Sequence, residues 1–269
     1  GRSMILPPGW RERTLKELPQ RWDIVVVGGG ISGAGILREA ARLNQRVLLL
    51  EQADFASGSS SKSSKMVHGG LRYLAEKEFG LVRQSVRDRQ RLLREVPGLV
   101  DTLHFAFTDY SFQEFSRRMF RVGLRIYDLM ARARSSRYLS SEATRALAPR
   151  LLNEGLKGSF AYNDAGTDDA RLTIENIKTS LLFGAQALNY ARVNDFIYKD
   201  EKVAGIKATD ETTGKEFIIK SKYVISAAGP WVDELRSVNN SKKGKQLHLT
   251  KGVHLVFPYE KLPVKQSCY

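Results

Sequence analysis

Three glycines and one acidic residue have the types and spacing of a site that binds a dinucleotide. Gly28, Gly30 and Gly33 follow the G-x-G-x-x-G pattern. Glycines at these positions would allow a tight turn, the close approach of a pyrophosphate and the close packing of a helix on a strand. Glu51 follows after roughly 20 residues, where a carboxylate can accept hydrogen bonds from an adenosine ribose. These residues predict a dinucleotide site rather than a simple glycine turn, but they do not separate NAD from FAD.

The elements around this pattern form a βαβ unit. Residues 24–27 are a short apolar run of β-branched residues, which predicts a buried parallel strand that ends at the glycines. Helical spacing follows over residues 32–43, and a second buried strand is predicted over residues 47–50. Such a unit directs phosphates to free backbone N–H groups at the positive end of the helix.

The rest of the chain mixes helices and strands, and it includes a polar loop over residues 52–70. Residues 1–3 have the appearance of a cloning scar, and residues 1–20 are expected to lie outside the fold. Helices are predicted at 79–95, 113–134, from near 141, and at 169–183. Strands are predicted at 104–107, 158–162, 193–198, 203–209, 216–220 and 223–227.

Composition limits the class of protein without naming a partner. The 269 residues are 42% hydrophobic, which suffices for a sizeable core, and the single cysteine cannot form an internal disulfide. No apolar run approaches the length that spans a bilayer, and no signal-peptide pattern is present, so we expect a protein that is soluble or bound to a membrane surface. The formal charge of +14 fits nucleic acid, an anionic membrane or an anionic small substrate.

Four spaced motifs resemble a known family. Residues 60–74 (SSKSSKMVHGGLRYL), 162–172 (which end in DDARL), 227–232 (AAGPWV) and 249–255 (LTKGVHL, expected to be a strand) occur in order along the chain. They are similar to elements of the flavin-dependent, aerobic-type glycerol-3-phosphate dehydrogenases, and this chain resembles the N-terminal half of that family. The resemblance selects FAD as the cofactor.

The resemblance implies an α/β flavoprotein of two domains that is incomplete at its C-terminus. We expect a βαβ FAD-binding domain over residues 21–96 and 169–244, interleaved with an antiparallel-sheet substrate cap over residues 97–168 and 245–269. The family half that is absent from this chain would supply further strands of the cap, so the fragment alone is expected to be inactive. The resemblance places the protein in the cytoplasm or at the cytoplasmic side of a membrane, as a peripheral protein.

The implied reaction is the oxidation of sn-glycerol 3-phosphate to dihydroxyacetone phosphate. Hydride would pass from C2 to flavin N5, and electrons would pass on to quinone. An alternative with the same motifs is a glycerol-3-phosphate oxidase that uses O2. A remote alternative is a basic nucleic-acid-binding module, which we do not favour because no aromatic-rich binding signature accompanies the charge; no nucleic-acid partner is therefore expected.

Candidate cofactor residues come from the glycine turn, the serine-rich loop and the later motifs. Small hydroxyl side chains and glycines let backbone N–H groups approach a flavin or a pyrophosphate, although serines of this loop could instead be simply solvated. The FAD-binding candidates are Gly28, Gly30, Ser32, Gly33, Glu51, Ser60, Ser61, Ser64, Lys65, Gly69, Gly70, Val193, Ala228 and Gly229.

Candidate substrate and catalytic residues lie in the same motifs. The resemblance places Arg72 and Tyr73 on the substrate side, where a guanidinium can bind a phosphate monoester through two hydrogen bonds; a structural salt bridge is the alternative for Arg72. Loss of the C2 hydroxyl proton requires a base, and His254 and His68 are the candidates, with a hydrogen-bonded core histidine as the alternative. No metal site is predicted, because the sequence has no cluster of ligands at metal-binding spacing.

The predicted helix at 113–134 is both basic and amphipathic. Such helices bind anionic bilayers, and the resembled family is typically peripheral to the membrane. The alternative is the solvated basic face of an ordinary core helix. Its charged and apolar residues are Arg117, Arg118, Arg121, Arg125, Arg132 and Arg134 among Phe115, Phe120, Leu124, Leu129 and Met130.

Overall fold

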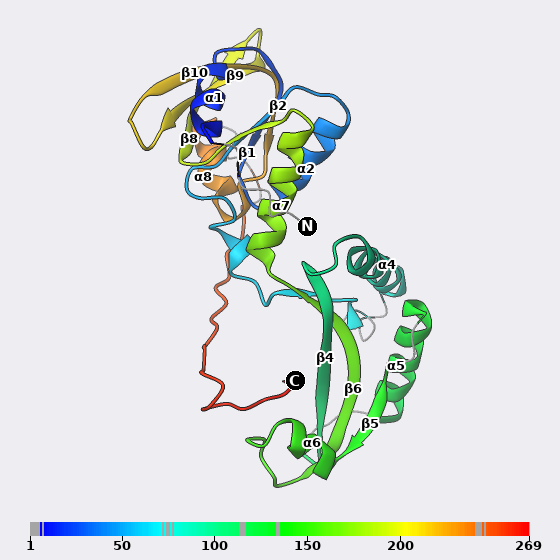
Figure 1. Cartoon of the computed structure of the whole chain (residues 1–269). Helices are drawn as coiled ribbons and strands as arrows, with labels where there is room; N and C mark the ends of the chain where they lie inside the picture. Colours follow the sequence, from blue (N-terminus) through cyan, green and yellow to red (C-terminus); the bar gives the residue numbers. More distant parts are fainter. Residues whose placement is uncertain are drawn as a thin grey trace. The chain divides into compact units, whose positions relative to one another are not determined.

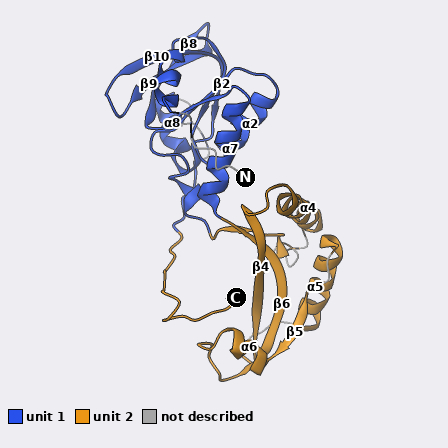
Figure 2. Cartoon of the chain, in the orientation of Figure 1, with its two compact units in different colours: residues 1–63, 168–251 blue, residues 64–167, 252–269 orange. Residues whose placement is uncertain are grey.

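The chain forms two units, and each is built from two separate stretches of sequence. The computed structural model describes residues 6, 8–71, 73, 76, 78–112, 117–132, 135–239, 244 and 246–268. The first unit contains Gly1–Ser63 and Asp168–Lys251, and the second contains Ser64–Thr167 and Gly252–Tyr269 (Figure 2). The stretches of the two units therefore alternate along the chain.

Six strands form the sheet of the first unit: β1 (Trp22–Val27), β2 (Val47–Leu50), β7 (Gln186–Leu188), β8 (Ala191–Lys199), β9 (Lys202–Asp210) and β10 (Glu216–Ser226). Their order in the sheet is β7-β2-β1-β10-β9-β8. β7, β2, β1 and β10 are parallel neighbours, whereas β10, β9 and β8 pair in antiparallel fashion. The two predicted apolar strands are β1 and β2, and every residue of β2 is buried.

Strand β10 is continuous where the sequence predicted two strands. Up to Lys220 it pairs with β9, and from Ser221 onward it pairs with β1. The polar Ser221 and Lys222 resemble a break in the sequence, but the strand only exchanges one neighbour for another there. The Ser221 hydroxyl donates to the carbonyl oxygen of Tyr223 at 2.7 Å, and Lys222 pairs with Asp23. The polar side chains are thus satisfied without interrupting the backbone.

Helices pack on this sheet and bury its parallel strands. The helices of the first unit are α1 (Trp10–Glu17), α2 (Ile31–Arg42), α7 (Asp169–Leu182) and α8 (Val232–Val238), with single 3-10 turns at Ser59–Ser61 and Gly229–Trp231. One face of α2 is small and apolar and includes Ala34 and Leu37. It packs against Val26 of β1 and Leu49 of β2, and against Ile177 of the adjacent α7 (Figure 1). This packing seats the start of α2 against the end of β1.

Helix α1 lies in the stretch that the sequence analysis placed outside the fold. Thr14 is buried, and its hydroxyl donates to the Gln186 side chain at 2.8 Å. Arg11 forms an ion pair with the buried Asp210 at 2.5 Å. The helix is short and polar, so its sequence carries no clear apolar face, and only contacts with distant strands reveal that it belongs to the first unit.

The second unit is built on an antiparallel pair of long strands. Its strands are β3 (Met66–Val67), β4 (Val100–Tyr110), β5 (Arg137–Ser140), β6 (Leu156–Thr167) and β11 (Ser267–Cys268). The sheet order is β11-β4-β6-β3, and β5 also pairs with β6. Its helices are α4 (Phe79–Glu95), α5 (Arg117–Ala131) and α6 (Ser141–Leu147). Phe105, Leu124, Phe160 and Tyr162 form a core between the sheet and α5.

Several boundaries differ from the sequence expectation. Residues 64–96 lie in the second unit, although they were predicted to belong to the FAD-binding domain; residues 246–251 lie in the first unit rather than with the cap. The predicted strand over 249–255 is not formed, because none of the described strands pairs with it. The predicted helix over 113–134 is described as α5, and residues 113–116 and 133–134 lie outside the described residues.

Candidate functional site

The turn between β1 and α2 requires glycine at two positions for steric reasons. Gly28 has a φ of +116°, and a Cβ there would lie 2.3 Å from the carbonyl oxygen of Ala227. A Cβ on Gly33 would lie 1.8 Å from the carbonyl oxygen of Gly28. Both obstructions are backbone atoms, so a side chain could enter only if the turn or the helix moved.

Gly30 is different, because its nearest neighbour is a movable side chain. Its backbone is extended, and a Cβ there would lie 3.0 Å from the hydroxyl oxygen of Ser60. The backbone N–H of Ile31 donates to the same hydroxyl at 2.9 Å. The first N–H groups of a helix lack partners within the helix and attract anions. Ser60 therefore occupies the position at which a phosphate oxygen could accept from the start of α2.

Glu51 links the turn to the loop that follows β2. Its carboxylate accepts hydrogen bonds from the N–H of Gly29 at 2.7 Å and from the N–H of Ala53 at 2.8 Å. An ionised carboxylate offers about four acceptor positions, so two backbone donors leave capacity for a ligand hydroxyl. Glu51 thus holds the glycine turn and still suits the ribose contact predicted for it.

These residues surround a cavity of about 590 Å³ within the first unit. That volume is in the usual range for sites of small molecules and cofactors, roughly 300–1,000 Å³. Eight of the predicted cofactor residues line it: Gly28, Gly30, Ser32, Glu51, Ser60, Val193, Ala228 and Gly229. Glycines that leave room for a pyrophosphate, helix N–H groups and a carboxylate for a ribose fit the adenosine diphosphate part of a dinucleotide.

Sequence reasoning missed four charged or aromatic residues of the cavity wall. They are Lys62, Arg192, Trp231 and Glu234. Lys62, Arg192 and Trp231 each lie beside a predicted site residue or inside a recognised motif, and this adjacency was the available signal; Glu234 lies just beyond the motif at 227–232. Lys62 and Arg192 add positive charge to a cavity that suits an anionic ligand.

Other predicted cofactor residues do not line this cavity. Gly33 packs beneath the turn, and the Ser61 hydroxyl donates to the Gly58 carbonyl oxygen at 3.3 Å. Ser64 and Lys65 are exposed residues of the second unit, and the Lys65 carbonyl oxygen accepts from Thr167 N–H at 2.9 Å. Their assignment as FAD contacts stays a prediction.

Gly69 and Gly70 are buried in the second unit for reasons of local packing. A Cβ on Gly69 would lie 2.1 Å from the Tyr127 hydroxyl, and the Gly69 N–H donates to Asp164 Oδ1 at 2.8 Å. Gly70 has a φ of +80°, and a Cβ there would lie 2.9 Å from the Tyr73 ring. Burial, together with the nearby Asp164 carboxylate, raises the pKa of Tyr127, which keeps the phenol neutral.

The candidate catalytic and substrate residues belong to the second unit. His68 is exposed, with its ring 5.9 Å from the Tyr73 ring. His254 is exposed in a stretch without regular structure. Arg72 lies outside the described residues. Their chemical roles stay predictions.

The described residues contain neither a cluster of metal ligands nor a membrane-spanning helix. No group of three or more His, Cys, Asp and Glu side chains among these residues could hold a metal ion. Among the same residues, no helix is both long and apolar enough to cross a membrane.

The known proteins that are similar to this chain are consistent with a dinucleotide site in this cavity. The family model "FAD dependent oxidoreductase" matches residues 23–268. The aerobic glycerol-3-phosphate dehydrogenase of Bacillus subtilis is 38% identical over 263 residues, which cover 96% of this chain and 47% of the relative. The chain therefore spans about half the length of the curated relatives it matches.

Two solved structures share the fold. The glycerol-3-phosphate dehydrogenase of Bacillus halodurans, complexed with FAD, superposes with a TM-score of 0.69 at 33% identity over 87% of this chain and 40% of that one. The L-alpha-glycerophosphate oxidase of Mycoplasma pneumoniae, also with FAD bound, gives a TM-score of 0.61 at 18% identity over 82% of this chain and 57% of that one, which shows the fold alone. With the family match over nearly the whole chain, this protein belongs to the FAD-dependent oxidoreductases.

Proposed function

We propose that this chain is the FAD-binding half of an enzyme that oxidises sn-glycerol 3-phosphate to dihydroxyacetone phosphate. The observation that carries the proposal is the 38% identity, over almost the whole chain, to an aerobic glycerol-3-phosphate dehydrogenase. The cavity beside the glycine turn supports it, because its wall suits a dinucleotide.

The chain's own residues have distinct tasks in this proposal. The N–H groups at the start of α2 and the Ser60 hydroxyl bind the pyrophosphate, while Glu51 binds the ribose. FAD, when bound, supplies the hydride acceptor for C2 of the substrate. The Arg72 guanidinium binds the phosphate monoester of the substrate, because it offers two parallel hydrogen bonds to it.

A histidine of the second unit takes the hydroxyl proton at C2. His68 and His254 are the two candidates, and an imidazole suits a base that works near neutral pH. His68 adjoins the two buried glycines and lies near Tyr73, so its backbone is held by the surrounding structure. His254 has no such support from regular structure, and we therefore favour His68 as the base.

Absorbance spectroscopy of the purified chain tests this function. FAD added to the chain should develop the resolved visible bands of a bound flavin, and glycerol 3-phosphate should then shift these bands. Glycerol, which lacks the phosphate, is the control ligand and should leave them unchanged. A flavin spectrum that ignores glycerol 3-phosphate would contradict the substrate, and a chain that takes up no FAD at all would contradict the cofactor site.

Quinone is the acceptor that we propose for the electrons, and O2 is the alternative. The much higher identity to a dehydrogenase than to the oxidase favours quinone, although 18% identity supports no more than a shared fold. An assay of hydrogen peroxide under air separates the two in a protein that turns over. Peroxide formed in proportion to substrate consumed would refute the choice of quinone.

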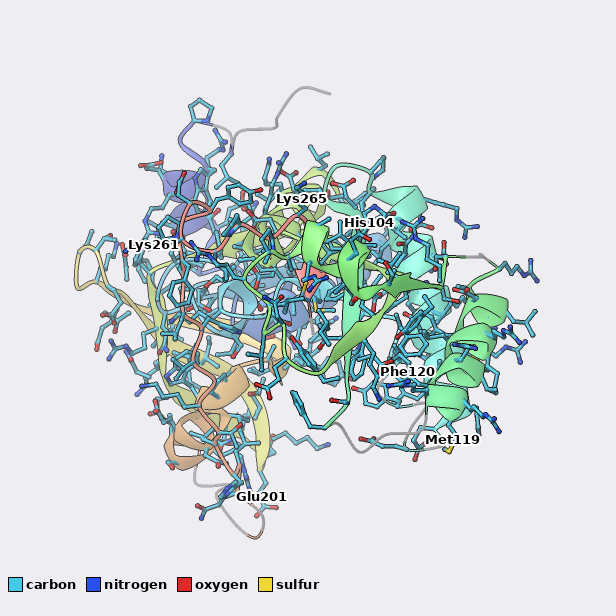
Figure 3. All side chains as sticks on the ribbon, turned by 90° about the horizontal axis from the view of Figure 1, so that it is seen from below. His104, Met119, Phe120, Glu201, Lys261 and Lys265 are labelled. Carbon is cyan, nitrogen blue, oxygen red and sulfur yellow. The ribbon has the colours of Figure 1, made fainter. Side chains whose placement is uncertain are left out.

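We further propose that α5 contacts an anionic membrane surface on its cytoplasmic side. Met119 and Leu129 are 76% and 78% exposed, and Met119 lies on the outer side of the helix in Figure 3, whereas Phe120 packs against Phe107 and Phe160. The same outer face carries the exposed residues Arg118, Arg121, Val122 and Arg125. Cations beside exposed apolar side chains are the pattern of helices that lie in a membrane interface.

Vesicle sedimentation tests this surface. The chain should sediment with vesicles that contain anionic phosphatidylglycerol and less with neutral phosphatidylcholine vesicles, and Arg121→Glu combined with Leu129→Ser should weaken binding. Arg38→Glu, on an exposed face of α2, is the control for a change of net charge. Equal binding of the α5 variant and the control variant would refute a role of α5.

A further inference from the structure

A buried cluster of charged and polar side chains lies beneath the loop that follows β3 in the second unit, which begins at His68. Arg89 of α4, Tyr127 of α5 and Asp164 of β6 are at most 3% exposed. An Arg89 guanidinium nitrogen lies 3.0 Å from Asp164 Oδ1 and 2.6 Å from the Tyr127 hydroxyl. The three side chains therefore connect two helices to the central strand of the sheet (Figure 1).

The cluster also binds the backbone of the loop. Asp164 Oδ1, the oxygen that pairs with Arg89, accepts the hydrogen bond from Gly69 N–H. The Tyr127 hydroxyl leaves no room for a side chain on Gly69. One face of the Gly69 peptide is thus bound by a carboxylate and covered by a phenol.

Leu71 and Tyr73 pack against the buried cluster that contains Tyr127, whereas His68 to Gly70, just before them, is the part of the loop that is hardest to order. Strand β3 before it has only two residues, and two consecutive glycines follow His68. Glycine has the largest backbone freedom of any residue, so ordering this segment is costly in conformational entropy. The hydrogen bond to Asp164 and the contact with Tyr127 restrict that freedom where it is greatest.

Stability alone gives little reason to bury these charges. A buried ion pair is often no more stabilising than apolar side chains of the same volume, because both charges must be desolvated. Among the described residues, moreover, the buried Arg89 Nε finds no hydrogen-bond partner. An arrangement that costs desolvation and leaves a donor unsatisfied is better explained by the geometry it imposes.

We propose that Arg89, Asp164 and Tyr127 are positioning residues that hold the Gly69 peptide and thereby orient the segment from His68 to Leu71 for substrate binding. The link to substrate rests on the proposed function, whereas the link to the loop rests on the contacts above. None of the three side chains is assigned a contact with substrate. Their effect passes through the Gly69 backbone.

Hydrogen exchange of the whole chain tests the link to the loop. The double variant Arg89→Met with Asp164→Leu removes both charges together, which avoids an unpaired buried charge, and it removes the acceptor of Gly69 N–H. The matched control is Arg91→Met with Glu95→Leu, an exposed ion pair of 2.7 Å on the same helix. We expect about tenfold faster exchange at the Gly69 amide in the first variant and no change in the control.

Comparison with other segments separates positioning from general loosening. In the positioning variant, amides of β4 and β6 away from the loop should exchange as in the parent. Unchanged exchange at Gly69, or an equal increase throughout the second unit, would overturn the proposal. If the double variant does not fold, Tyr127→Phe carries the same test, because it removes one oxygen and keeps the ion pair; its increase should again be confined to the loop.

Ligand titrations test the link to substrate. The positioning variants should bind glycerol 3-phosphate at least tenfold more weakly than the parent, whereas the control Arg91→Met with Glu95→Leu should bind it as the parent does. Unchanged binding of glycerol 3-phosphate would overturn the role in substrate binding. A parent chain that binds FAD but not glycerol 3-phosphate would instead refute the proposed function, and the exchange result would still decide whether the cluster positions the loop.

Discussion

Substitution of Gly33 by alanine isolates the steric requirement of the phosphate turn. The new Cβ would lie 1.8 Å from the Gly28 carbonyl oxygen and 3.0 Å from its carbonyl carbon. Ordinary non-bonded contacts lie near 3.5 Å, so α2 and the turn must separate by roughly 1.7 Å. The Gly28 backbone cannot easily move, because its N–H donates to the carbonyl oxygen of Leu50 at 2.8 Å. We therefore expect a cost near the upper end of overpacking, about 3 kcal/mol.

Thermal unfolding followed by circular dichroism measures this cost. For a unit of about 150 residues, 3 kcal/mol lowers Tm by about 6–12 °C. Gly35→Ala is the matched control, since it makes the same chemical change in the same helix, where a Cβ meets nothing within 4 Å. Because alanine favours the helix by about 1 kcal/mol, the control should raise Tm by about 2–4 °C.

The two substitutions should shift Tm in opposite directions, and the direction of each shift is the test. Opposite shifts for two glycines that are two residues apart can arise only from what each Cβ meets. A Gly33→Ala protein that unfolds within 1 °C of the parent, or that shifts upward with Gly35→Ala, would refute the close packing of α2 on the turn.

Three further changes test other parts of the site and fold. Gly30→Val should abolish FAD uptake with little loss of helix signal, because its nearest neighbour is the movable Ser60 side chain; FAD titration that matches the parent would contradict the phosphate turn. Arg72→Ala should weaken glycerol 3-phosphate binding about 30- to 150-fold, the loss of about 2–3 kcal/mol, without changing FAD affinity, and an unchanged substrate titration would leave Arg72 a structural role. Burial raises the pKa of Asp210, but hydrogen bonds from Thr212, Thr213 and Arg11 outweigh it and leave the pKa below its usual value. Its stabilising effect is therefore present above about pH 4 and lost as pH falls through the lowered pKa, so the parent should lose more Tm between pH 6 and pH 2 than Asp210→Asn; equal losses would contradict this.

Much of the first unit follows from local sequence. The strand, glycine turn, helix and second strand from β1 to β2 were predicted because each depends on periodicity and on steric limits within a few residues. In the second unit, helix α4 was likewise predicted with the bounds Phe79–Glu95 that the structure has, since its apolar spacing is regular. Eight predicted cofactor residues line one cavity, and seven of them come from the glycine turn, Glu51 and the recognised motifs, whereas Val193 lies outside them.

Contacts between distant residues decided the rest. Nothing local reveals that β10 changes partner at Ser221, that the polar helix α1 is held by Gln186 and Asp210, or that Asp164 binds Gly69. The residues 249–255 have strand-forming side chains, yet a strand also needs a neighbour to accept its hydrogen bonds, and none of the described strands pairs with them. The sequence by itself determined the elements and the chemistry of the glycine turn, because these depend on neighbouring residues. Only the tertiary structure decided which polar groups are buried together, because that depends on partners far apart in the chain.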